Sequence, residues 1–132
     1  MADVPVPLMT TRRLLIAANL AFATLLLVLG VVPDIPEIGA DIPDVAAHGI
    51  AYAAQTVLLF AMLLPSTGRC SAAILAALAA IAYGGLVEGL QSFQPARTVE
   101  IRDLGANALG AVVAATLLYL VAGRERQVAA DE

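Results

Sequence analysis

The chain of 132 residues is 61% hydrophobic and only 14% charged, whereas a soluble domain is roughly 45–50% apolar and about 25% charged. This composition excludes an ordinary soluble domain, and a formal net charge of −4 without a basic stripe excludes a nucleic-acid-binding protein. A single cysteine, Cys70, excludes an intramolecular disulfide and a cysteine metal cluster.

Four long apolar runs follow one another along the chain, at about 14–32, 45–65, 71–93 and 104–122. A run of about 18 apolar residues is a membrane-span candidate, because about 20 helical residues cross the hydrocarbon core. We therefore predict an all-α, multi-pass membrane protein with a bundle of four transmembrane helices. The bundle occupies 14–122, and 1–13 and 123–132 are short tails. The first run is longer than the apolar part of a signal peptide, and no small-x-small cleavage site follows it. We therefore expect it to be retained as a helix.

Prolines mark the predicted connections between the spans. Pro33, Pro36 and Pro43 punctuate the first connection, Pro65 is expected to close the second helix, and Pro95 to end the third. All three connections are too short to hold a further domain.

The distribution of arginine predicts the orientation, since all seven basic residues are arginines. Those in the two tails and the second connection are Arg12, Arg13, Arg69, Arg124 and Arg126, against Arg97 and Arg102 in the third connection. The positive-inside rule then puts both termini in the cytoplasm and the first and third connections outside. These outer segments also carry Asp34, Glu37, Asp41, Asp44, Glu100 and Asp103.

The polar residues of three spans fall at a similar depth below this outer face. Given the helical rise, His48 lies about 6 Å below Asp44, Asn107 about 6 Å below Asp103, and Glu88 about 10 Å below the end of its span. Small residues recur every fourth position on the same faces, at Ala72, Ala76, Ala80 and Gly84 and again at Ala106, Gly110 and Ala114. Such spacing favours close helix packing in lipid, so Glu88 and Asn107 are expected to face inward.

The ordered set of these residues resembles the VanZ-like family. The matching pieces are Asp44-x-x-x-His48-x-x-x-Tyr52, Tyr83-Gly84-x-x-x-Glu88-Gly89-x-Gln91, Pro95-x-Arg97 and Asp103-x-x-Ala106-Asn107-x-x-Gly110. The resemblance implies a small protein of the bacterial cytoplasmic (inner) membrane. Founding members are associated with teicoplanin resistance, which the resemblance does not extend to this chain. Relatives often have lysine where this chain has Val45, which leaves the choice of ligand open.

The predicted site combines two catalytic candidates with a set of ligand-binding residues. Glu88 and His48 are the acid–base candidates, because a charge at membrane depth costs about 2.5–3.5 kcal/mol and is seldom kept without a role. The ligand-binding candidates are Arg97, Asp103, Asn107, Gln91, Asp44 and Tyr52. Structural alternatives remain open: Glu88 could pair with Arg97, and the aspartates could only cap helices. No cofactor is expected, and one histidine with two distant carboxylates gives no metal-ligand spacing.

The leading hypothesis is binding, with processing left open, of a lipid-linked or cell-envelope head group in an outward-facing polar pocket. Membrane lipids or lipid-linked envelope precursors would be the partners, with Arg97 on an anionic group and the ends of two helices assisting. The acidic surroundings would repel an anion unless a cation bridged them. The rivals are a proton-coupled carrier, in which Glu88 titrates, and a non-catalytic structural or accessory subunit. Enzymatic activity and oligomeric state stay open.

Overall fold

The computed structural model describes residues 8–32, 43–93 and 101–131, and these form four helices and no strand. The helices are α1 (Leu8–Val31), α2 (Asp44–Thr67), α3 (Arg69–Gln91) and α4 (Ile101–Asp131). Each is long and apolar enough to cross a membrane. The predicted all-α, multi-pass membrane architecture is therefore confirmed.

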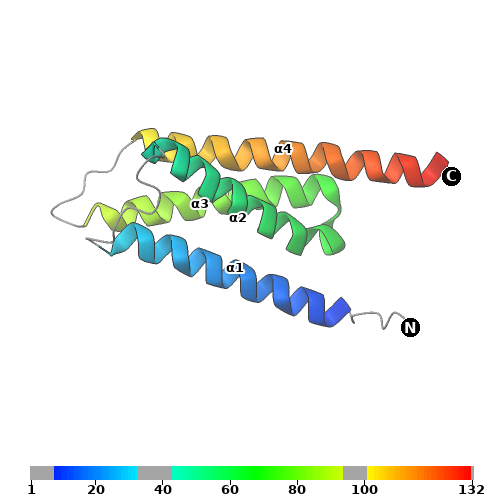
Figure 1. Ribbon diagram of the computed structural model, residues 1–132, viewed down its shortest axis with the longest axis horizontal. Coiled ribbons are helices and arrows are strands. Elements are labelled where there is room, and N and C mark those ends of the chain that lie inside the picture. The colour runs from blue at the N-terminus through cyan, green and yellow to red at the C-terminus, as the bar shows by residue number, and fades with distance from the viewer. Residues whose placement is uncertain (1–7, 33–42, 94–100, 132) are drawn as a thin grey trace.

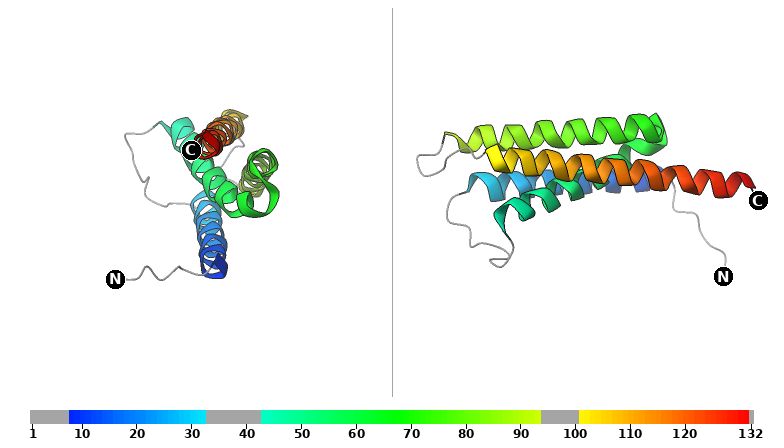
Figure 2. Two further views of the ribbon diagram at one scale, coloured as in Figure 1. Left: turned by 90° about the vertical axis from the view of Figure 1, so that its right-hand side faces the viewer. Right: turned by 90° about the horizontal axis from the view of Figure 1, so that it is seen from above.

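The helices run alternately up and down, so that α1 and α3 end where α2 and α4 begin (Figure 1). The start of α1 and the end of α4 lie at the opposite end of the bundle. In the described residues α2, α3 and α4 contact one another, whereas α1 contacts α2 and α3 but not α4. Figure 2 shows this arrangement end-on, with α1 beside the group formed by the other three helices. The site described below is built from these three helices.

Small side chains bring the helices together, as their spacing predicted. Ala72, Ala76 and Ala80 of α3 are all fully buried, and the series leads to the buried Glu88. Gly110 of α4 lies so close to α2 that a Cβ atom there would collide with the carbonyl oxygen of Gly49. In lipid, where apolar contact has little driving force of its own, this close packing is a main source of helix association.

The helix ends differ from the sequence prediction in three places. α1 begins at Leu8, α4 continues to Asp131, and Pro65 lies inside α2 rather than closing it. The last turn of α2 is completed by the hydroxyls of Ser66 and Thr67, which both donate to the carbonyl of Leu63. The helix ends instead before Gly68, whose φ of 76° is left-handed and favours glycine.

Candidate functional site

His48 is the centre of a polar cluster at the end of the bundle where α2 and α4 begin. Its Nδ1 atom lies 3.1 Å from Asn107 Oδ1 and 3.9 Å from Glu88 Oε1. Its Nε2 atom lies 3.8 Å from Asp44 Oδ1 and 3.9 Å from Asp103 Oδ2. The structure thus brings together five of the eight predicted site residues, and one histidine ring contacts groups from α2, α3 and α4.

The cluster is exposed on one side and closed on the other. The side chain of Asp44 is 80% exposed and that of His48 is 24% exposed, whereas those of Asp103 and Glu88 are 11% and 3% exposed. Glu88 therefore faces the bundle interior and not lipid, as the small residues on its helix face predicted. A solute arriving at the open side reaches Asp44 and His48 first.

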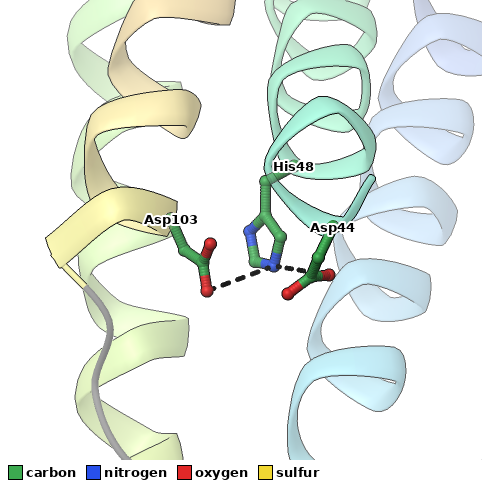
Figure 3. A group of neighbouring side chains, drawn as sticks. All are labelled: Asp44, His48 and Asp103. Atoms are coloured by element: carbon green, nitrogen blue, oxygen red, sulfur yellow. Dashed lines mark ion pairs between the residues drawn. The ribbon is translucent and has the colours of Figure 1, made fainter. Parts of the chain in front are cut away.

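Asp44 is not the N-cap of α2, so that alternative is wrong for Asp44. The N-cap of α2 is Pro43 with no side-chain hydrogen bond, and Asp44 is the first helical residue. Asp103 is the third residue of α4, inside the helix. Both carboxylates nevertheless lie in a first turn, where negative charge is favoured by the helix dipole. Their position leaves the carboxylate oxygens directed at His48 (Figure 3).

Asn107 lies at the buried base of the cluster. It is 2% exposed, its Oδ1 faces His48, and its Nδ2 has no hydrogen-bond partner among the described residues. A Cβ atom on Gly84 would lie 3.0 Å from Asn107 Nδ2 and 3.0 Å from the ring of Tyr52. A glycine at position 84 therefore leaves room for both side chains under the site, and Tyr52 is part of its floor.

Two predicted site residues are placed differently. Gln91 is buried, and its side-chain amide donates to the Gly30 carbonyl of α1 at 2.7 Å. This bond ties α1 to α3. Arg97, the predicted anion-binding residue, lies outside the described residues, and so does Pro95.

Further polar contacts secure α1, and sequence reasoning missed them. Gln55 Nε2 donates to Asn19 Oδ1 at 3.2 Å, and Asn19 Nδ2 donates to the Leu58 carbonyl at 3.1 Å. Tyr83 donates its hydroxyl to the carbonyl of Ala23. Asn19 is the only strongly polar side chain between Leu14 and Val32, and that isolation was the available signal. These contacts position a helix and are separate from the cluster around His48.

Three side chains of the cluster, one histidine and two carboxylates, lie close enough together to offer ligand atoms to one ion. Asp44, His48 and Asp103 each offer one ligand atom, and these atoms all lie within 4.8 Å of one another. Glu88 does not belong to this group, because it faces the other ring nitrogen of His48.

The motif set and the fold agree with a comparison against known families, in which the VanZ/LLP1 family model matches residues 6–122. The chain belongs to the VanZ/LLP1 family. The match includes α1 to α3 and most of α4 of this VanZ/LLP1 protein, whereas the motifs lie in the last three helices. It confirms the resemblance. No curated protein and no solved structure matches the chain.

Proposed function

We propose that this VanZ/LLP1 protein binds the anionic head group of a lipid-linked envelope component at the outer face of the bacterial cytoplasmic membrane. The observation that carries the proposal is the polar cluster around His48, which is open at Asp44 and closed at Glu88. Titratable side chains retained inside a membrane bundle generally mark ligand or ion sites, because burying them is costly.

The position of the cluster suits a head group better than a soluble ligand. His48 is the fifth residue of α2 and Asp103 the third residue of α4, so both lie near the start of a membrane-spanning helix and near the level of the lipid head groups. α2 and α4 also begin at this end, and their free backbone N–H groups carry partial positive charge. A phosphate-bearing lipid in the adjoining leaflet would reach these groups without leaving the membrane.

The arrangement gives less support to a proton-coupled carrier. Such a carrier needs titratable groups that continue toward the other face. In the described parts of the spans, only uncharged side chains lie between the cluster and the arginines at the other end, Arg12, Arg13, Arg69 and Arg124. In these parts of the spans, no carboxyl group or histidine could pass a proton from Glu88 to the other face.

The test is lipid retention measured by native mass spectrometry on the purified protein. The probes are a polyprenyl phosphate, phosphatidylglycerol and a zwitterionic lipid of matched chain length, each added to delipidated protein in detergent. His48→Ala removes the centre of the cluster, and Glu88→Gln keeps the shape of the buried side chain but removes its charge. Leu109→Ala is the control, because Leu109 is 67% exposed on the lipid-facing side of α4.

We expect the wild type and Leu109→Ala to retain an anionic probe, and His48→Ala to retain at least tenfold less. Glu88→Gln separates binding from processing: retained binding with lost turnover of the bound head group would assign Glu88 to chemistry. If the wild type holds the anionic probes no better than the zwitterionic one, and all variants behave alike, the cluster only fixes helix packing. The structural-subunit hypothesis would then replace this proposal.

A further inference from the structure

We propose that Asp44, His48 and Asp103 form a binding site for one divalent transition-metal ion, such as Zn²⁺ or Mn²⁺. The three side chains converge on one point from α2 and α4, as Figure 3 shows. The donor set of one imidazole and two carboxylates suits these ions, since imidazole binds Zn²⁺ well and carboxylates suit Mn²⁺. The spacing of Asp44 and His48 on one helix, four residues apart, places both ligands on the same face.

The distances fit a shared cation better than direct hydrogen bonds. His48 Nε2 is 3.8 Å from Asp44 Oδ1 and 3.9 Å from Asp103 Oδ2. Hydrogen bonds between such atoms are about 2.7–3.2 Å long. A metal held at about 2.0–2.2 Å from each ligand separates two ligand atoms by up to about 4 Å. The three ligand atoms lie within 4.8 Å of one another, so an ion between them requires a small inward movement of both aspartate side chains.

The two ring nitrogens of His48 face different groups. Nδ1 lies 3.1 Å from Asn107 Oδ1 and 3.9 Å from Glu88 Oε1, whereas Nε2 lies toward Asp44 and Asp103. A ring that donates its Nδ1–H to Asn107 presents Nε2 as the metal-binding atom, on the same side as the two carboxylates.

Asn107 supplies an independent indication of a ligand. Metal-binding histidines almost always give their second ring N–H to a fixed acceptor, which sets the tautomer and the ring orientation. Asn107 is that acceptor, at 2% exposure, and it holds this orientation although its Nδ2 atom has no hydrogen-bond partner in the described part of the chain. A buried amide group without a partner costs about 1–3 kcal/mol, so a buried polar side chain at this position calls for a role beyond packing.

A metal here would also remove an objection to anion binding at an acidic site. Three protein ligands leave coordination positions open, and the 80% exposure of Asp44 puts them on the accessible side. A phosphate oxygen could occupy one of these positions, with the cation bridging it to the aspartates. This bridging role rests on the proposed function, whereas the metal site itself does not.

The experiment measures metal binding first, without lipid. Full-length protein in a Cys70→Ser background, which removes the exposed thiol, is stripped with a chelator and titrated with Mn²⁺ under electron paramagnetic resonance; Zn²⁺ then competes for the site. The variants are Asp44→Asn, His48→Gln, Asp103→Asn and Asn107→Ala. Asp44→Asn should fold as the wild type does, because the side chain is 80% exposed. Asp131→Asn, at the far end of α4, is the matched control.

We expect one Mn²⁺ per chain, displaced by Zn²⁺, with affinity lowered at least tenfold in each ligand variant and unchanged in Asp131→Asn. Asn107→Ala should lose about 10–100-fold, the usual cost of removing the group that orients a histidine ligand. Substoichiometric binding, or equal binding by wild type and Asp44→Asn, would overturn the metal site. Repeating the lipid assay with and without chelator separates the two proposals. Metal binding without lipid retention overturns only the proposed function, and lipid retention insensitive to the chelator overturns only the bridge.

Discussion

The hydrogen bond between His48 Nδ1 and Asn107 Oδ1, 3.1 Å long, joins α2 to α4 at the point where both helices enter the bundle. The same two helices are also close at Gly49 and Gly110, where a Cβ atom on Gly110 would collide with the backbone of Gly49. Helix packing and site geometry are thus coupled, because a shift of α4 would move Asn107 and Asp103 together relative to His48.

We predict that Asn107→Ala lowers the free energy of unfolding by about 1 kcal/mol, since interhelical hydrogen bonds in membrane proteins average about 0.6 and reach about 1.7 kcal/mol. Unfolding in mixed micelles, followed by circular dichroism, measures the change. Leu109→Ala, two residues further along α4 and exposed, should alter the unfolding free energy by less than half as much. Equal losses in both variants would show that the bond to His48 contributes nothing.

We predict that Gly110→Ala destabilises the bundle more than any other glycine-to-alanine change in α4. The added Cβ would meet the Gly49 carbonyl, and overpacking of this kind typically costs about 1–3 kcal/mol. Gly105→Ala is the matched control, because a Cβ there has nothing within 4 Å and alanine gains about 0.5–1 kcal/mol of helix propensity. The two variants should therefore shift the unfolding midpoint in opposite directions. A shift of the same sign in both would contradict the close α2–α4 contact.

Much of this architecture could be predicted from sequence, because the determinants are local. Long apolar runs specify membrane helices whatever their neighbours are. The recurrence of small residues at every fourth position, Ala72, Ala76 and Ala80, predicted the buried face of α3. Helical rise alone placed His48, Glu88 and Asn107 at one depth, and the structure brings them together.

The remaining features depend on contacts between helices, which spacing along one chain does not encode. Asp103 has the residue type of a helix cap, yet its carboxylate faces His48, which only the packing of α2 on α4 brings near. Asp44 faces the same histidine from one turn earlier on α2. Gln91 was predicted in the site because it lies three residues from Glu88, but Gly30 of α1 takes its hydrogen bond. Pro65 failed as a helix terminator, because it costs only the one hydrogen bond of its missing N–H while α2 continues two residues further to Thr67.

We predict that Asn19→Leu loosens α1 without affecting the polar cluster. The substitution removes the acceptor of Gln55 and the donor to the Leu58 carbonyl, which leaves Gln55 with a buried, unsatisfied amide. A cysteine pair across the α1–α2 contact should cross-link less efficiently in the variant, while metal and lipid binding remain as in the wild type. Reduced binding with unchanged cross-linking would mean that Asn19 acts on the site and not on α1.

The last prediction concerns the side of the membrane on which the site lies. Arginine counting puts both termini, and therefore the Cys70 end of the bundle, in the cytoplasm. Cys70 is exposed, so a membrane-impermeant maleimide should label it only after the cells are opened. The reciprocal variant, Asp44→Cys with Cys70→Ser, puts the single thiol at the other end, where the native side chain is 80% exposed, and should label in intact cells. Tagged protein and quantitative mass spectrometry measure both labelling ratios. If Cys70 labels in intact cells and the cysteine at position 44 does not, the site faces the cytoplasm, and the outer-leaflet ligand is wrong.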